Sequence, residues 1–133
     1  MKNNFLVKKI SNKNWCISYN KWRWIVIFTK RQIKFNTKDG FTNFKVVGEC
    51  GYCIEVNSNC FECHLYKENV CCSAEYLKKA GKNYKDIPYL RYVFNMREVL
   101  RKNLDKPRWK EILADALTMR DTIKADKPFA QRI

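Results

Sequence analysis

The chain of 133 residues contains a single histidine, His64, and it lacks the glycine-rich loop that cradles phosphates in nucleotide-binding enzymes. One histidine cannot supply the several imidazole ligands of many hydrolytic metal sites. The sequence also shows no pairing of a nucleophile with a base, and the glutamates near its cysteine-rich segment are irregularly spaced. We therefore expect a protein that is not an enzyme.

Long apolar runs are absent as well. No stretch approaches the roughly 18 apolar residues of a membrane-spanning helix. The first ten residues lack the apolar stretch, about 7–15 residues long, of a secretory signal. We expect no membrane partner and a cytoplasmic location, which would be the host cytoplasm for a phage-encoded protein.

Acidic residues are scarce, since 13 Asp and Glu oppose 27 Lys and Arg, giving a formal net charge of +14. The imbalance is concentrated in residues 1–47, which carry eleven basic side chains and one acid, Asp39. This excess is larger than solubility requires. It favours an anionic polymer, RNA or DNA, or a nucleoprotein as the partner.

The order of apolar and polar residues predicts an α+β fold in which the first part is a sheet. Residues 15–19 and 22–29 alternate with a period of two, as strands do, and Asp39-Gly40 is a strong hairpin signal. We predict an antiparallel β-meander of four or five strands over residues 1–47.

The last part of the chain has a helical period instead. Apolar residues from Tyr89 to Leu104 recur every three or four positions, and a second helix is expected from about Asp105 to Pro128. Ser73 to Ala80, closed by Gly81, predicts a short third helix. The prediction is one domain, 1–133, with a basic β-sheet in 1–47, a zinc knuckle in 48–72 and a helical part, mainly a helical pair, in 73–133.

Six of the seven cysteines lie between Cys50 and Cys72 and include two Cys-x-x-Cys pairs. Two such turns can surround one Zn²⁺ tetrahedrally, and Gly51 permits a tight turn in the first pair. A closed four-thiolate site is structural. The predicted zinc ligands are Cys50, Cys53, Cys60 and Cys63, with Cys71, Cys72 or His64 as substitutes.

Two other uses of these cysteines fit the same pattern. An iron–sulfur cluster is also held by four cysteine thiolates. Redox-active dithiols also have the Cys-x-x-Cys spacing, although they usually occur as one pair in a βαβ context. Cys16, outside the cluster, is expected to be a small buried apolar residue.

The stretch CGYCIEVNSNCFECHLYKENVCC, followed by an aromatic-rich helical segment, resembles small accessory proteins encoded by tailed phages and prophages. Those proteins carry Cys-x-x-Cys, a short polar spacer, Cys-x-x-Cys-Pro-Leu and a later cysteine, and this chain departs from them at His64, in place of Pro. The likeness covers about 25 residues. It implies a phage accessory protein with a structural metal, of a type used in nucleic-acid handling or in counter-defence, anti-CRISPR proteins included.

Basic side chains beside exposed aromatic rings suit single-stranded nucleic acid, because phosphates meet the charges and bases stack on the rings. The function predicted is non-catalytic binding of nucleic acid or a nucleoprotein through the N-terminal sheet, without strong base-sequence preference. The alternative is an anti-CRISPR-like inhibitor or adaptor that binds a host protein or ribonucleoprotein. The predicted contact residues are Arg23, Lys30, Arg31, Lys34, Lys38 and Lys45, with Trp22 and Trp24 for stacking.

Overall fold

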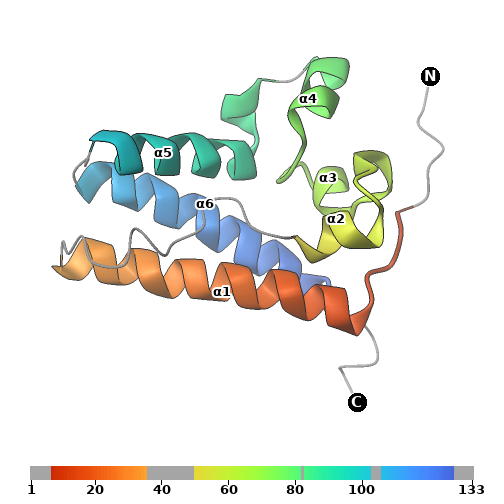
Figure 1. Ribbon diagram of the computed structural model, residues 1–133, viewed down its shortest axis with the longest axis horizontal. Coiled ribbons are helices and arrows are strands. Elements are labelled where there is room, and N and C mark those ends of the chain that lie inside the picture. The colour runs from red at the N-terminus through yellow and green to blue at the C-terminus, as the bar shows by residue number, and fades with distance from the viewer. Residues whose placement is uncertain (1–6, 36–49, 82, 103–105, 128–133) are drawn as a thin grey trace.

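The computed structural model describes residues 7–35, 50–81, 83–102 and 106–127, and every regular element in these ranges is helical. Three helices are long: α1 (Asn12–Phe35), α5 (Pro88–Lys102) and α6 (Lys106–Ala125). Between α1 and α5 the chain forms the short elements α2 (Gly51–Glu55), η2 (Cys60–Glu62), α3 (His64–Lys67), α4 (Ala74–Ala80) and η3 (Tyr84–Asp86) (Figure 1). No helix within the described ranges is both long and apolar enough to cross a membrane.

The predicted β-meander is wrong, because the residues read as its first strands form the single helix α1. Its buried positions, from Trp15 through Ser18, Trp22 and Ile25 to Thr29, are three or four residues apart, which is the helical period. Aromatic and β-branched residues also occupy alternate positions, so the same stretch imitates a strand. The Asp39-Gly40 hairpin and the strand after it fall outside the described residues.

The start of α1 has a local signal that favours a helix. The Ser11 hydroxyl accepts a hydrogen bond from the backbone N–H of Asn14 at 3.3 Å, as an N-cap residue does. No glycine or proline occurs between Asn12 and Phe35. The chain therefore has an N-cap followed by an uninterrupted run of helix-compatible residues. It has no glycine or proline between residues 19 and 22, where the predicted sheet required a turn.

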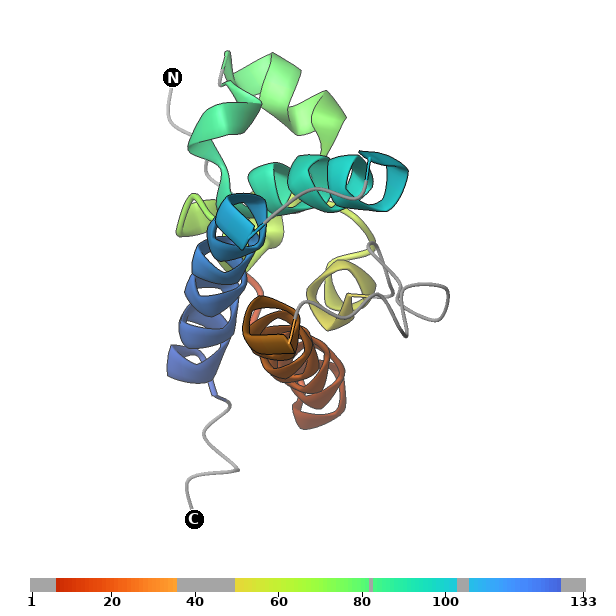
Figure 2. The same ribbon diagram turned by 90° about the vertical axis from the view of Figure 1, so that its left-hand side faces the viewer.

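The core lies among the three long helices, and α6 packs against both α1 and α5 (Figures 1 and 2). Trp22 of α1 is 1% exposed and meets the rings of Tyr89 and Tyr92 edge-on, at centroid distances of 6.0 and 4.9 Å. The indole N–H of Trp15 donates to the Ile123 carbonyl oxygen at 2.7 Å, which ties α1 to the end of α6. Thus α1 is one wall of the core.

The predicted helical pair in the last part of the chain is present as α5 and α6. The Arg91 guanidinium and the Asp115 carboxylate join the two helices with an N···O distance of 2.8 Å. The predicted third helix is α4, where the Ser73 hydroxyl accepts the Tyr76 N–H at 3.3 Å and Gly81 closes the helix with φ +66°. Helical periodicity was therefore a reliable signal here.

The short helix α2 lies directly on α1, and the approach is close at Gly51 (Figure 2). The Gly51 N–H donates to the Ser18 hydroxyl at 2.8 Å. A Cβ atom on Gly51 would lie 1.8 Å from the carbonyl oxygen of Asn14. Glu55 adds a second contact by accepting from the Ser11 N–H at 2.7 Å. Gly51 is thus required for helix contact, and not only for the turn that its place in Cys-x-x-Cys suggested.

Replacing Gly51 with Ala should lower the free energy of unfolding by about 2 kcal/mol or more, since neither backbone can yield to the added methyl group easily. Urea denaturation followed by circular dichroism measures this. Gly81→Asn is the control, because nothing lies within 4 Å of a Cβ there and Asn tolerates positive φ. Equal stability of Gly51→Ala and the wild type would contradict the close contact.

Candidate metal centre and nucleic-acid interface

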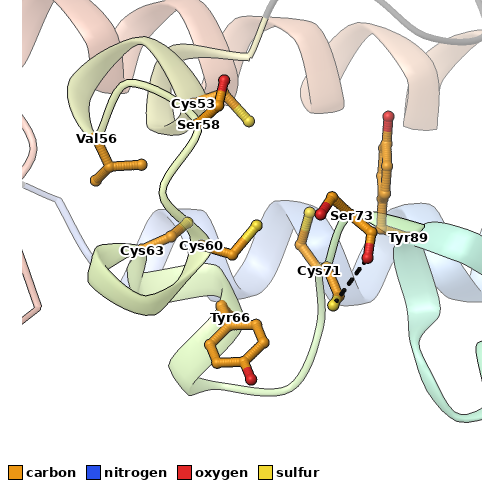
Figure 3. Close-up of a pocket in the computed structure, with 10 residues that line it drawn as sticks. Cys53, Val56, Ser58, Cys60, Cys63, Tyr66, Cys71, Ser73 and Tyr89 are labelled. Atoms are coloured by element: carbon orange, nitrogen blue, oxygen red, sulfur yellow. Dashed lines mark hydrogen bonds between the residues drawn. The ribbon is translucent and has the colours of Figure 1, made fainter. Parts of the chain in front are cut away.

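Five of the six clustered cysteines line one cavity of about 230 Å³ between α2, η2 and the segment after α3 (Figure 3). Figure 3 shows the sulfur atoms of Cys53, Cys60 and Cys71 directed toward this space. All seven cysteines lie in the described part of the chain, and none forms a disulfide. The cysteines lining the cavity are Cys53, Cys60, Cys63, Cys71 and Cys72.

The spacer between the two Cys-x-x-Cys pairs folds back in a compact turn. Asn57 and Ser58 have φ values of 51° and 64°, in the left-handed region. Asn59 then caps η2, because its side-chain oxygen accepts the Phe61 N–H at 3.1 Å. Two left-handed residues and one cap thereby bring the second pair to the same cavity as the first.

The sixth cysteine of the cluster, Cys50, is the N-cap of α2 and neighbours Cys53. Its sulfur lies 3.6 Å from the Ser18 hydroxyl oxygen. The Cys53 thiol donates to the Cys50 sulfur, and this bond, helped by the Ser18 hydroxyl and the N–H groups of Cys53 and Tyr52, lowers the pKa of Cys50 against the effect of burial. The same bond raises the pKa of Cys53. Cys50 is therefore the thiol best prepared to ionise.

Cys63 is buried and Cys71 is half-buried. Burial raises the pKa of Cys63 to about 11, although the backbone N–H groups of Tyr66 and Leu65 stabilise its thiolate. Burial also raises the pKa of Cys71 well above its usual value, and neighbouring thiolates, first that of Cys50, raise it further. Each ionised sulfur opposes ionisation of the next, and a bound cation would offset this repulsion.

A lysine from α1 reaches the same region. The Lys21 ammonium lies 5.3 Å from the centroid of the Trp22 ring and 6.0 Å from that of Tyr89, a residue that lines the cavity. Burial lowers the pKa of Lys21, while the negative charges of Cys50, Cys71 and Cys53 act in the opposite direction. The helix that carries the basic residues therefore also contributes a charge to the cysteine cluster.

Three of the four predicted ligands, Cys53, Cys60 and Cys63, line the same cavity, but they do not form a coordination site. Among the residues that the structure describes, no three His, Cys, Asp or Glu side chains are close enough to hold an ion. Two predicted substitutes point elsewhere: the Nε2 atom of His64 lies 3.8 Å from a carboxylate oxygen of Asp126, and the Cys72 thiol donates to the Ser73 carbonyl oxygen at 3.2 Å. The remaining donors are thiols, which suit zinc or an iron–sulfur cluster.

The second candidate site is the exposed face of α1, which we term the basic face. α1 contains no Asp or Glu. Trp24 is 56% exposed, and its ring packs edge-on against the buried Phe28, with 6.4 Å between centroids. This contact supports the indole on the side that faces the core. Helical spacing puts all members of this set on one side of α1. The basic face consists of Arg23, Trp24, Ile27, Lys30, Arg31 and Lys34, all of them exposed.

Most of the predicted contact residues share this face even though residues 12–35 form a helix and not the predicted strands. Trp22 is the exception, since it is buried in the core and unavailable for stacking. Lys38 and Lys45 fall outside the described residues. Ile27 and Lys21 were missed. Placing residues 12–35 on a helical wheel would have put Ile27 beside Trp24, whereas the position of Lys21 depends on tertiary packing.

The function of the chain is inferred from the geometry of these two sites. Comparison of the chain with protein-family models, with curated proteins and with solved structures found no match. The resemblance of Cys50–Cys72 to small phage-encoded cysteine proteins stays a prediction.

Proposed function

We propose that this protein is a non-catalytic nucleic-acid-binding protein of the cytoplasm, that the basic face of α1 contacts a single strand, and that the cysteine segment binds a structural Zn²⁺. The observation that carries the proposal is the exposed Trp24 among four cations on a helix without acids. Phosphates meet the cations and an unstacked base meets the indole.

The dimensions of the basic face suit a short length of strand. From Arg23 to Lys34 the helix rises about 16 Å, at about 1.5 Å per residue. Stacked nucleotides repeat about every 3.4 Å, so the face spans about five of them. Four neutralised phosphates would give a log–log salt slope of about −3 for a single strand. A duplex would leave Trp24 and Ile27 without unstacked bases to cover them.

The proposed zinc has a structural role. Four thiolates close the coordination shell, so the ion has no open position for substrate or water. The segment that it would organise carries α2, which packs on α1 at Gly51 and Ser18. Zinc at this place supports the helix that presents the basic face.

Reversing two charges on the basic face, with Arg23→Glu and Lys30→Glu together, should weaken binding of a fluorescently labelled single strand at least tenfold and make the salt slope shallower by about 1.4. Lys67→Glu with Lys85→Glu is the matched control, since both lysines are exposed and lie on α3 and η3. Equal weakening by the two pairs would contradict a defined site on α1.

Removing the exposed indole with Trp24→Ala should cost about 1–3 kcal/mol of single-strand affinity and leave weak duplex binding nearly unchanged. Trp24→Phe keeps a ring and should lose less. Fluorescence anisotropy with a poly-pyrimidine oligonucleotide and its duplex measures both. If binding of neither nucleic acid depends on Trp24, and the partner purified from a lysate is a protein that resists nuclease, the adaptor alternative replaces this proposal.

Removing the metal should lower the melting temperature, because the ion's binding free energy contributes to folding. The purified protein is expected to hold one zinc per chain by elemental analysis, and a strong chelator should reduce its helical signal on heating at a lower temperature than before. Iron with inorganic sulfide in place of zinc would contradict the zinc assignment, and an unchanged melting curve would contradict the structural role.

A further inference from the structure

We propose that a pocket between α5 and α6 binds the Watson–Crick edge of one unpaired guanine, and that the adjacent base of the strand stacks on Phe94. The inference rests on the single-stranded ligand of the proposed function, but it uses a surface other than the basic face. It adds a preference for one base. The α5–α6 pocket is a cavity of about 250 Å³ lined by Arg91, Asn95, Glu111, Ala114 and Asp115.

The α5–α6 pocket lies between two helices that pack side by side (Figure 1). Asn95 and Asp115 are 7% and 5% exposed, whereas Glu111 and Ala114 are exposed. A ligand that enters past the exposed pair therefore reaches polar groups that are almost fully buried. The volume is that of about eight water molecules, which is smaller than the pockets of drug-sized ligands and suits the edge of one base.

The Asn95 side chain has an unused donor. Arg108 Nη1 donates to Asn95 Oδ1 at 2.6 Å. Because a guanidinium can only donate, this bond fixes which end of the amide is the oxygen. Within the part of the chain that the structure describes, the amide nitrogen has no hydrogen-bond partner. A ligand oxygen that accepts from this nitrogen would therefore gain a hydrogen bond in a largely desolvated place.

Two carboxylates at the pocket can accept further hydrogen bonds. Asp115 Oδ1 accepts from Arg91 Nη2 at 2.8 Å, but Asp115 Oδ2 has only a long contact of 3.4 Å with Arg91 Nε. The Glu111 carboxylate lies 3.9 Å from Arg108 Nε, which is too far for a hydrogen bond. The ion pair that joins α5 to α6 therefore leaves acceptor positions free on both acids.

The charges around the pocket cancel, because two guanidiniums, of Arg91 and Arg108, oppose the two carboxylates. An uncharged group with its own donors and acceptor therefore fits better than a metal ion or a phosphate. The Watson–Crick edge of guanine has two donors, N1–H and the N2 amino group, and one acceptor, O6. The other bases each have a single donor group on this edge, which is accessible in an unpaired strand. We expect the carboxylates to accept from guanine and the Asn95 amide to donate to O6.

An exposed ring beside the pocket favours a base over other small polar ligands. Phe94 is 45% exposed and lies three residues after Arg91 on α5, so the two are neighbours on the helix surface. The Phe94 ring contacts that of Tyr84, with 5.6 Å between centroids. Arg97 is exposed three residues further along α5 and can meet a phosphate. Stacking on a ring is tolerant of sequence, so the preference for guanine would come from the pocket.

The experiment measures binding of the wild-type chain to labelled single strands of about 20 nucleotides by fluorescence anisotropy. One strand contains only thymidine, and the others carry one guanosine, inosine or 7-deazaguanosine at the centre. The guanosine strand should bind about 5- to 150-fold more tightly than the thymidine strand, as for one specific base contact. Inosine lacks the N2 amino group and should lose most of this gain. The 7-deaza base keeps its Watson–Crick edge and should retain the gain.

Variants of the chain test the location of the site. Asp115→Asn should abolish the preference for the guanosine strand. Glu111→Gln changes an exposed residue and should reduce the preference even if loss of the Arg91 pair prevents Asp115→Asn from folding, which circular dichroism shows. Asp121→Asn removes an exposed carboxylate from the same helix outside the pocket, so it is the matched control and should keep the preference. Phe94→Ala should weaken binding of every strand about fivefold or more, and Phe94→Tyr should not.

Equal affinities of the wild type for the thymidine and guanosine strands would overturn the inference while leaving the proposed function in place. A preference that persists with inosine, or in both Asp115→Asn and Glu111→Gln, would also overturn it, because the pocket would not be reading the base edge. If the wild type binds none of the strands, the proposed function fails and this inference fails with it.

Discussion

The contact of α2 with α1 at Gly51 is the constraint on which both candidate sites depend. The absence of a side chain lets the backbone of α2 reach the Asn14 carbonyl, and the Ser18 hydroxyl then serves both the Gly51 N–H and the Cys50 sulfur. The cysteine segment is therefore built onto the side of the helix whose other side is the basic face. A metal centre here would act on α1 directly, without an intervening domain boundary.

The fold could be predicted only in part, for a reason visible in α1. Around Trp22 to Phe28 apolar residues occupy both odd and even positions, so periods of 2 and of 3.6 fit equally well over this length. Tertiary packing decides between the two periods. Trp22, Ile25 and Val26 are buried in the core, as a helix requires, whereas Trp24 and Ile27 are exposed to solvent. In α6, by contrast, Trp109, Ile112 and Ala116 follow one period without competition, and the prediction there was right.

The candidate sites likewise depend partly on local spacing, which the sequence shows, and partly on tertiary packing, which it does not. The spacing of cysteines within each pair is local information, and it was enough to predict that the segment would gather its thiols. The approach of Cys71 and of Lys21 is not local, because it depends on the turn after α3 and on how α1 lies against α5. The predicted basic residues Arg23, Lys30 and Lys34 still share one face, because their spacing places them on the same side of a helix.

The unequal burial of the tryptophans has a practical consequence. Trp15, Trp22 and Trp109 are enclosed in the core, and Trp24 alone of the chain's four indoles faces solvent on the proposed binding surface. Long-wavelength emission and its quenching by small solutes therefore report on Trp24, whereas the short-wavelength emission reports on core integrity. The protein carries two intrinsic optical probes, one for occupancy and one for foldedness, and neither requires a label.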